Sequence, residues 1–332
     1  MTPAELSWTV LSTVRRAVAA DELRVAVPEK IVVQRPPRPG CGDYATNVAL
    51  QLAGQAGRSA YEVAGILAVR LAREPGIAQV EVAGAGFLNI TLSARAYADV
   101  VRQVREQGAD YGRGEGLADE AVTVVAEPPG AVRATMVAEV VNGLLRAAGA
   151  GHGDRRESLT VAEGVAEGGD ATARLGRDAA RWSLLRPPAE DPPRPGPALL
   201  AQREANPLFR VRYVHSRTRA LLRNAHDLGV RVEAAARDPY RHPAETELLG
   251  LIADFPRVVE TAARRRAPDR LARHLERLAD AYLRFQDECP ALPKGDEKPS
   301  AVHAARVRLA DATGIVLADG LHLLGISAPD HL

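Results

Sequence analysis

Arginine side chains are the groups of this sequence best placed to do chemistry. In the predicted helix that follows Pro207, Arg212, Arg219 and Arg223 recur with His215 at helical spacing, on the side opposite the apolar stripe. A guanidinium group stays ionised and binds a phosphate or a carboxylate through two parallel hydrogen bonds. The spacing suits a phosphate-binding face, but periodicity alone slightly favours the alternative, a solvated helix surface.

A second arginine-rich face is predicted further along the chain. Its members are Arg264, Arg265, Arg266, Arg270, Arg273, Arg277 and Arg284. Glu276, Asp280 and Asp287 lie among them, and this balance slightly favours a solvated surface over a phosphate site. Only three of the 43 basic residues of the chain are lysine, so any basic face is built from the side chain best adapted to phosphate.

Motifs for autonomous catalysis are missing from the sequence. It contains no GxxxxGK[ST], GxSxG or HExxH motif and no GxGxxG after a strand. Gly84 and Gly86 flank Ala85 in a turn between two predicted strands, which is more typical of a hairpin than of a phosphate cradle. His215 and Arg219 have no second histidine or cysteine nearby to complete a metal site. We therefore predict no catalytic residue, no metal and no cofactor.

The overall composition is that of an ordinary soluble protein of two or three domains. The chain has 332 residues, with 46% hydrophobic and 26% charged side chains and a net charge of +1. Cys41 and Cys289 are too few and too far apart for a disulfide framework, which favours a reducing cytoplasm. Neither a signal peptide nor a membrane span is expected.

The amino-terminal part predicts an α+β domain over residues 1–115. Leu6, Val10, Val14 and Val18 form the apolar stripe of a first helix. The further elements expected are a strand at Val25–Val33, helices at Asp43–Leu52, Tyr61–Ala72 and Ala94–Glu106, and strands at Gln79–Val82 and Phe87–Leu92. A Gly-rich tract, Gly108–Gly116, marks the boundary.

The middle, residues 116–198, predicts a degenerate α/β remnant followed by a linker. A strand at Val122–Val125 leads into a helix that ends near Ala148, and another helix is expected at Arg177–Arg186. Gly149–Gly176 shows no periodic pattern, and the prolines of Pro187–Pro197 exclude helix and central strand. Proteases are expected to cut these two stretches early.

The remainder, residues 199–332, predicts an all-α helical bundle. Asn206 and Pro207 form a helix-start pair. In a later helix, apolar side chains recur at intervals of four, three, four and three residues, which is a strong amphipathic signal. They are Leu271, Leu275, Leu278, Tyr282 and Phe285.

Motifs at both ends resemble the arginyl-tRNA synthetase family. PPRPGCGDYATNVALQLA at Pro36–Ala53 and VEVAGAGFLNITL at Val80–Leu92 are similar to the family's amino-terminal accessory domain. NPLFRVRYVHSRTRALLRNA at Asn206–Ala225, DFPRVVETAA at Asp254–Ala263 and LLGISAP at Leu323–Pro329 resemble its helical anticodon-binding domain. The resemblance covers roughly residues 1–116 and 199–332.

The middle departs from the family pattern. The family carries a run similar to NPTGPLHVGHARG, whose histidines contact the ATP phosphates, whereas Ala126–Ala150 here contains no histidine. The sequence GHGDRRES stands where a KMSK-like motif is expected, and most of the catalytic α/β domain has no counterpart between these landmarks. Because adenylate formation needs donors aimed at the reacting phosphate, aminoacylation by this chain alone is not expected.

The resemblance also assigns residues that would contact tRNA. Phe87 and Asn89 stand where the family places its D-loop base contacts, and Tyr213, His215 and Leu332 lie in its anticodon-facing region. Arg212 and Arg219 complete the tRNA-binding set through the basic face described above. Without the resemblance, Phe87 is a core residue and Asn89 a turn cap. Cys41 replaces a histidine of the family motif, and the chain ends in HL where RM is usual.

The leading hypothesis is a tRNA-binding, synthetase-like paralogue without autonomous aminoacylation, with an arginine tRNA as its partner. Under a second hypothesis the chain presents tRNA to a partner enzyme that supplies the chemistry, or retains a residual ATP-dependent arginine-tRNA ligase activity. A third makes it a protein-interaction module that binds no nucleic acid.

Overall fold

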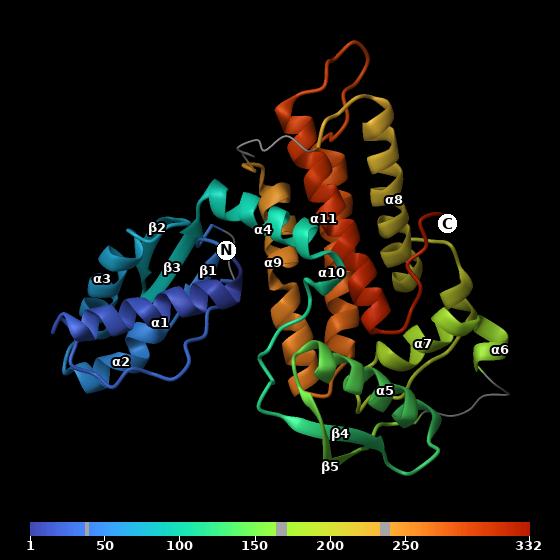
Figure 1. The fold of residues 1–332 in the computed structure, drawn as a ribbon, viewed down its shortest axis with the longest axis horizontal. Helices are drawn as coiled ribbons and strands as arrows, with labels where there is room; N and C mark the ends of the chain where they lie inside the picture. The colour runs from blue at the N-terminus through green and yellow to red at the C-terminus, as the bar shows by residue number, and fades with distance from the viewer. Residues whose placement is uncertain (37–39, 164–170, 233–239) are drawn as a thin grey trace. The chain divides into compact units, whose positions relative to one another are not determined.

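The computed structural model describes residues 1–36, 40–163, 171–232 and 240–332. They divide into two compact units: residues 1–100 together with Tyr240 and Arg241 form the first, and the other described residues from Val101 onward form the second. The fold is that predicted from sequence, an α+β domain followed by a small α/β element and a helical bundle (Figure 1). Within the described ranges, none of the helices combines the length and the apolar character needed to span a bilayer.

The first unit is a three-stranded antiparallel sheet packed against helices. The strands lie in the order β1-β3-β2, with β3 pairing in register with both neighbours. The strands are β1 (Tyr44–Thr46), β2 (Ile77–Ala83) and β3 (Phe87–Leu92), and the helices are α1 (Pro3–Ala19), α2 (Val48–Ala56) and α3 (Ala60–Leu71). Helix α4 (Ala94–Gln107) follows the sheet. Leu6, Val10 and Val14 are fully buried, as the predicted stripe of α1 requires, whereas its last member, Val18, is half-buried.

A glycine fixes the hairpin between β2 and β3. Gly86 has φ +128°, and a Cβ at this position would lie 2.8 Å from the backbone of Ala60. Any other residue would therefore be strained and would push α3 away from the turn. The Gly84–Gly86 segment is thus a hairpin turn, and both strands predicted around it are confirmed.

Two elements predicted in this unit are wrong. Val25–Val33 is not a strand, and the nearest pairing is an isolated bridge between Gln34 and Ala45. Ile31 and Val33 are buried, so the apolar pattern reflects packing, while Pro28 has no amide hydrogen to donate to a sheet. The helix predicted from Asp43 begins only at Val48, because the preceding residues pair with β3 as β1.

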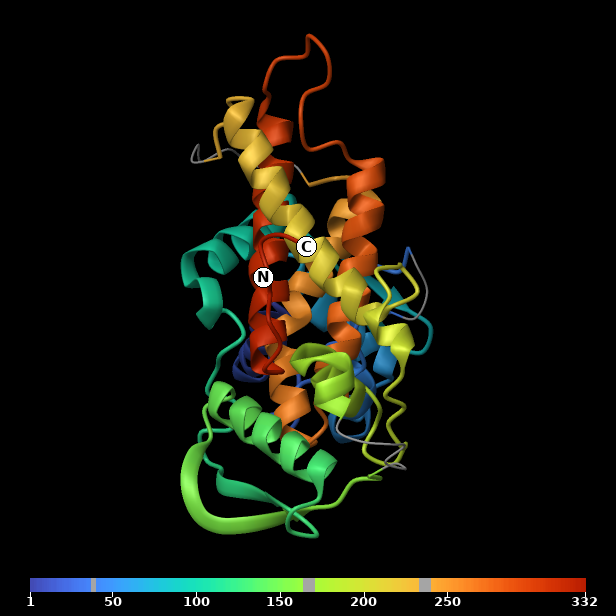
Figure 2. The same ribbon diagram turned by 90° about the vertical axis from the view of Figure 1, so that its right-hand side faces the viewer.

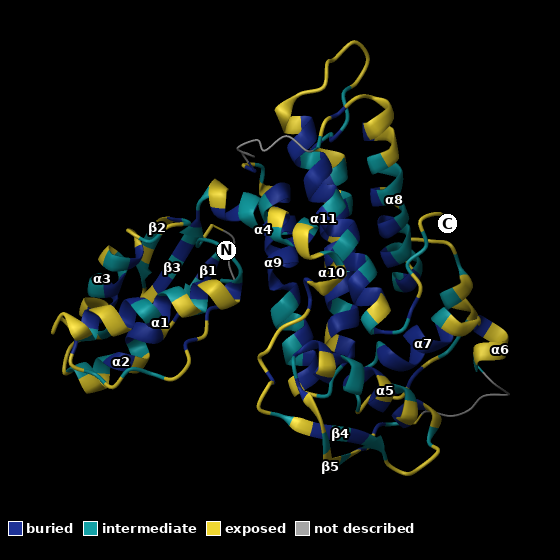
Figure 3. Ribbon diagram, viewed as in Figure 1, coloured by how far each residue is buried: buried dark blue, intermediate teal, exposed yellow. Residues whose placement is uncertain are grey.

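The core of the second unit is a bundle of four long helices (Figures 1 and 2). They are α8 (Pro207–Asp227), α9 (Pro243–Arg264), α10 (Asp269–Glu288) and α11 (Ala301–Leu323). The side chain of Asn206 accepts hydrogen bonds from the amides of Leu208 and Phe209, which confirms the predicted start of α8. All five members of the predicted α10 stripe are buried, and Figure 3 shows the dark interior of the bundle that they help to fill.

The middle of the chain adds a small α/β element to this unit. Its members are η1 (Gly108–Asp110), β4 (Ala121–Ala126), α5 (Val132–Ala147), β5 (Gly151–Leu159), α6 (Ala171–Leu175), α7 (Arg177–Leu185) and η2 (Pro197–Leu200). Strands β4 and β5 are parallel, with α5 as the crossover. The expectation of no regular structure in Gly149–Gly176 is wrong for β5 and for the short helix α6, and residues 164–170 of this stretch lie outside the described residues. Strand β5 is mostly exposed and polar, and it is held by backbone pairing that leaves no apolar pattern.

A buried arginine joins this element to the Pro-rich tract. Arg133, at the start of α5, is 1% exposed, and each of its five N–H donors faces a backbone carbonyl. Nε donates to Leu184 at 2.9 Å, and the two terminal nitrogens donate at 2.5–2.9 Å to the carbonyls of Ala162, Pro187, Pro188 and Asp191.

Glu163 completes the arrangement around Arg133. Its carboxylate accepts the backbone amides of Arg133 and Ala134 at 2.9 and 2.8 Å, at the amino-terminal end of α5. Burial lowers the pKa of Arg133, and the nearby Glu163 charge acts in the opposite direction. The carbonyl cage and this carboxylate compensate a charge taken out of water.

The Pro-rich tract is therefore not a free linker where Arg133 holds it. Residues 187–196 contain neither helix nor strand, as predicted, yet three of their first five carbonyls are bound by one guanidinium group. The prolines supply no donors of their own, so their carbonyls depend on a donor from elsewhere in the chain. Early cutting of this tract by proteases is therefore expected when Arg133 is replaced.

Replacing Arg133 is expected to release the Pro-rich tract. Arg133→Leu leaves five carbonyls without their donor, so the free energy of unfolding should fall by about 3–5 kcal/mol. Urea unfolding measures this loss, and brief digestion with a nonspecific protease should cut within residues 187–196 of the variant before the wild type. Arg155→Leu, at an exposed position of β5, is the control and should shift stability by less than about 0.5 kcal/mol. Equal effects of the two substitutions would contradict the proposed role of Arg133.

Asp319 of α11 is a buried carboxyl in the same unit. It is 7% exposed, and its Oδ2 has no hydrogen-bond partner among the described residues. Burial raises its pKa to about 6, although a hydrogen bond from the backbone of Gly112 favours the charged form. The folded protein therefore holds this proton at a pH where the unfolded chain has already lost it.

This pKa predicts a pH-dependent effect of Asp319→Asn. Asp319 is neutral in both states at low pH; as the pH rises from about 4 to about 6 the unfolded state ionises first, and stability falls. Above about pH 6 the loss in the free energy of unfolding is constant and amounts to at most roughly 3 kcal/mol. The stability advantage of the variant over the wild type should therefore be larger at about pH 7.5 than at about pH 4.5. Urea unfolding at both pH values measures this difference. A difference that does not change with pH would show that the carboxyl charge is not responsible.

Candidate nucleic-acid interface

Phe87 and Asn89 lie on one face of β3 in the first unit. Strand residues two apart share a face, and the residues between and beyond them, Leu88 and Ile90, point into the core. Phe87 is 42% exposed and Asn89 is half-buried inside the strand. The alternatives of a core phenylalanine and a turn-capping asparagine are therefore wrong.

Both side chains line a pocket of about 530 Å³. Its wall also contains four polar side chains and an arginine, together with the thiol-bearing residue that replaces the family histidine. These are Gln34, Asn47, Gln51, Thr46, Arg35 and Cys41. Asn47 accepts a hydrogen bond from Gln51 at 3.1 Å across the first turn of α2, and Arg35 lies over the ring of Tyr44 at 5.9 Å.

This set of groups has the chemistry to hold a nucleobase. An exposed phenyl ring offers a stacking face, and amide side chains offer both a donor and an acceptor to a base edge. Arg35 supplies a positive charge at the wall of the same pocket. The sequence prediction named only Phe87 and Asn89; Asn47 and Gln51 could have been found in the quoted motif as an i, i+4 polar pair at the start of a helix.

The basic stripe of α8 binds the end of the chain itself. His215 Nδ1 donates to the carbonyl of Pro329 at 3.0 Å, and Arg219 forms an ion pair with Asp330 at 3.3 Å. Arg223 reaches His331 at 3.5 Å. The segment Ser327–His331, called the tail below, therefore contacts the face that sequence spacing predicted to be open to phosphate or solvent, and of these three residues it buries His215.

His215 is consequently a neutral, structural group in this arrangement. It is 4% exposed, and burial lowers its pKa more than its hydrogen bond to the Pro329 carbonyl raises it. A carbonyl only accepts, so the proton of the neutral ring resides on Nδ1. His215 therefore positions the tail and adds no positive charge to the surface.

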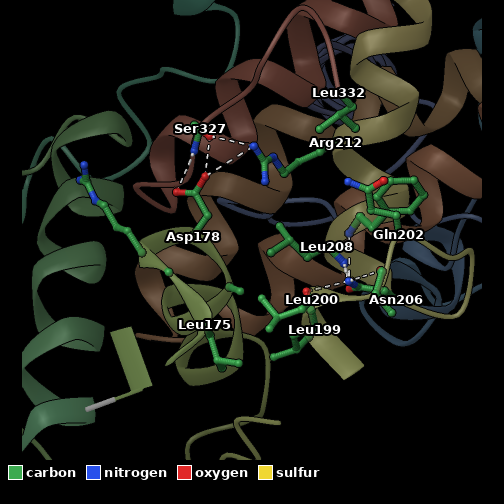
Figure 4. Close-up of a pocket in the computed structure, with 15 residues that line it drawn as sticks. Leu175, Asp178, Leu199, Leu200, Gln202, Asn206, Leu208, Arg212, Ser327 and Leu332 are labelled. Atoms are coloured by element: carbon green, nitrogen blue, oxygen red, sulfur yellow. Dashed lines mark hydrogen bonds and ion pairs between the residues drawn. The ribbon is translucent and has the colours of Figure 1, made fainter. Parts of the chain in front are cut away.

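Arg212 is tied to the tail and to α7 at once. Its guanidinium donates to Ser327 Oγ at 3.3 Å and lies 3.8 Å from the carboxylate of Asp178. Ser327 in turn donates to Asp178 through both its amide and its hydroxyl (Figure 4). Asp178 and Ser327 were not predicted, because only the tertiary structure brings α7, α8 and the tail together.

Arg212 and Leu332 line the same pocket, of about 530 Å³ (Figure 4). Leu332 is 53% exposed and so offers an apolar side chain at its edge. Most of the remaining wall comes from α6, α7, η2 and the start of α8. Tyr213, His215 and Arg219 do not line this pocket. Tyr213 stacks on Phe209, a residue of the pocket wall, at 5.6 Å and lies under Arg217 at 5.8 Å.

The second arginine-rich face is divided by carboxylates. Arg266 is largely buried between Glu120 and Glu157, at 3.2 and 2.9 Å. Other members pair with acids on their own or neighbouring helices, as in Arg264–Glu260, Arg273–Asp269 and Arg284–Glu247. The solvated-surface alternative holds for Arg264 and Arg284, whereas Arg266 is an internal tie between the bundle and β5.

Two family models match the chain at its two ends. Residues 10–92 match the arginyl tRNA synthetase N terminal domain, and residues 211–332 match the DALR anticodon binding domain. The chain is an arginyl-tRNA synthetase-like protein. Residues 93–210 lie between the two matches, and the chain is shorter than the full-length enzymes of the family.

Relatives and solved structures agree with this assignment. The arginine–tRNA ligase of Frankia alni is 27% identical over 552 aligned positions, with both chains fully covered, so its longer chain carries stretches without a counterpart here. That of Clavibacter sepedonicus is 43% identical over 164 residues, which are 49% of this chain and 30% of the relative. Arginyl-tRNA synthetases from Plasmodium falciparum and Thermus thermophilus share the fold, with TM-scores of 0.68 and 0.64, identities of 9% and 14%, and coverage of 99% and 100% of each chain.

Weakening the contacts of α8 is expected to loosen the tail without unfolding the protein. In Arg212→Ala/Arg219→Ala the tail loses two partly exposed charged contacts, so global stability should change by no more than about 1–2 kcal/mol. Hydrogen exchange at the Ser327 amide, which donates to Asp178, should become several-fold faster. Arg217→Ala, on the same helix but in contact with Tyr213, should leave this exchange unchanged. Unaltered exchange in the double variant would mean that other contacts hold the tail.

Proposed function

We propose that this protein binds tRNA, with an arginine isoacceptor as its preferred partner, and does not activate arginine on its own. The observation that supports tRNA binding best is the pocket of Phe87 and Asn89, which combines a stacking ring, amide groups and an arginine within a domain of the synthetase family. In this proposal the pocket receives a base of the D-loop, the role that the family resemblance assigns to the two residues.

The anticodon would be held by the second unit, in the region of the DALR match. Arg212 and Leu332 line a pocket there, and Tyr213 stacks on Phe209 of its wall. Because His215 is buried against the tail and Arg219 is paired with Asp330 of the tail, these two residues act by shaping the surface rather than by direct contact with phosphate. The anticodon contact is accordingly assigned to Arg212, Tyr213 and Leu332.

Two observations support the absence of autonomous amino-acid activation. The segment Ala126–Ala150 has no histidine, and its buried arginine, Arg133, is fully occupied by internal carbonyls. In the described part of the second unit, β4 and β5 form a two-stranded sheet only. Such a remnant offers no set of donors directed at a reacting phosphate.

The two alternatives predict different partners. A tRNA-presenting component would raise the turnover of a partner enzyme, and a protein-interaction module would have no affinity for nucleic acid. Sequencing the RNA that co-purifies with the protein distinguishes a protein-interaction module, which would retain no tRNA, from the proposed tRNA-binding protein. The expected cytoplasmic location belongs to the same proposal, since that is where tRNA and free thiols such as Cys41 and Cys289 coexist.

Asn89→Ala is expected to reduce discrimination between tRNAs. Losing one base-edge contact should weaken binding of the preferred tRNA by about 1–3 kcal/mol and that of other tRNAs much less. Filter binding of arginine tRNA and of a non-cognate tRNA measures both values. Gln79→Ala removes an exposed amide of β2 outside the pocket and serves as the control. If Asn89→Ala leaves the preference unchanged while the circular dichroism spectrum is preserved, the D-loop contact is wrongly assigned.

The second prediction concerns activation of arginine. ATP–pyrophosphate exchange with arginine, measured with and without tRNA, should not exceed the blank without protein. Exchange clearly above that blank would contradict the non-catalytic part of the proposal. It would not affect the proposal of tRNA binding, which rests on the Phe87 pocket and is tested by the filter-binding assay.

A further inference from the structure

Five arginines surround one hollow of the second unit, at the junction of α7, α9 and α10. They are Arg186, Arg257, Arg270, Arg273 and Arg277, and together with Glu276, Val258 and Thr261 they form what we call the arginine pocket. Its volume is about 640 Å³. Glu276 is the single acidic residue of the lining, so the wall carries a clear excess of positive charge.

Helical spacing explains why these side chains converge. Arg270, Arg273 and Arg277 follow each other at three and four residues and so share one face of α10. Arg257 and Thr261 are four residues apart on α9, the helix packed beside α10. Arg186 follows the last turn of α7 directly. The three helices therefore aim their side chains into the same space from different sides.

Internal ion pairs hold part of the wall in place. Arg186 donates to both oxygens of Glu276, at 3.0 and 3.1 Å, in the bidentate geometry that fixes a guanidinium group. Arg257 and Arg273 pair with Asp254 and Asp269 at 3.2 and 3.4 Å. Both of these aspartates are buried, so they lie behind the wall and leave the outer face of the two arginines toward the pocket.

Arg270 and Arg277 carry the surplus charge. Both are exposed, and within the described part of the chain Arg277 forms no ion pair. Arg270 feels the charge of Asp269, a carboxylate that already pairs with Arg273. Counting Asp254 and Asp269 with Glu276, five arginines still outnumber the carboxylates beside them. Like charges that line one hollow repel one another, and an anion bound among them offsets this repulsion.

We propose that the arginine pocket binds a ligand through two or more neighbouring phosphate groups. Guanidinium groups match phosphate oxygens geometrically and do not lose their charge with pH. The lining contains no aromatic side chain on which a base could stack, so recognition rests on the phosphates alone. A volume of about 640 Å³ exceeds the needs of one phosphate, and the charge of the wall exceeds that of one phosphodiester.

Such phosphates have two sources, the backbone of a bound tRNA and a free polyphosphate. The first source rests on the proposed function, and the second does not need it. A tRNA backbone held here would be a contact additional to the Phe87 pocket and to the pocket of Arg212 and Leu332. The site is defined by its phosphate chemistry in either case, and the experiment below separates the two sources.

Binding of inorganic triphosphate to the purified full-length chain tests the site directly. Isothermal titration calorimetry should show binding by the wild type that is weakened by on the order of tenfold or more in Arg270→Ala/Arg277→Ala. The matched control is Arg265→Ala/Arg284→Ala, which removes the same charge from exposed positions of the same two-helix region outside the pocket. Thermal melts verify that both variants are folded.

The outcomes are distinguishable. Loss of triphosphate affinity confined to the pocket variant supports the site, and a parallel loss of tRNA affinity identifies the tRNA backbone as its ligand. If the tRNA affinity of that variant is unchanged, the ligand of the site is a free polyphosphate. If the wild type binds no tRNA at all, the proposed function is overturned but this phosphate site is not. Absence of triphosphate binding by the wild type, or an equal loss in the two folded double variants, overturns the inference.

Discussion

The arrangement of the second unit depends on one guanidinium group that is removed from water. Arg133 binds five backbone carbonyls contributed by residues 162–191, and its own helix is capped by Glu163 from the same region. A stretch rich in proline has few amide hydrogens, so its carbonyls cannot be satisfied by secondary structure. One side chain with five donors solves this problem, and it fixes α5, α7 and the Pro-rich tract relative to one another. Arg133 thus lies in the stretch where the family's nucleotide-contacting run is expected, and here its side chain holds parts of the chain together.

The tail has a comparable effect on α8. Its contacts with Arg212, His215 and Arg219 engage donors of the basic stripe with groups of the protein itself. A pattern of charges on a helix therefore does not by itself define a nucleic-acid interface, because carboxylates and carbonyls of the protein compete for the same donors. What stays accessible at this end is the pocket edged by Arg212 and Leu332, with the half-buried ring of Tyr213 stacked on Phe209 of its wall.

Positive charge is left over where the protein does not neutralise it. Arg266 is enclosed by two glutamates and so contributes to stability, whereas Arg270 and Arg277 lie at a hollow whose acids are already engaged. The distinction cannot be made from spacing, since all three residues belong to the same arginine-rich stretch. It is made by the elements on the other side: β5 and the loop before β4 face Arg266, and the end of α7 faces the pocket.

Sequence alone determined the elements whose signal is local. The α10 stripe, the Asn206–Pro207 helix start, the β2–β3 hairpin and the choice of Phe87 and Asn89 on one strand follow from periodicity, capping or motif resemblance, all of which are encoded in neighbouring residues. The tertiary structure decided the rest. Strand β5 has no apolar alternation, the carbonyl cage of Arg133 spans about thirty residues of chain, and the tail meets α8 across more than one hundred. Each of these depends on hydrogen bonds or ion pairs between groups that are far apart in the sequence. A local pattern of residue types does not encode such partners, because only the tertiary fold brings them together.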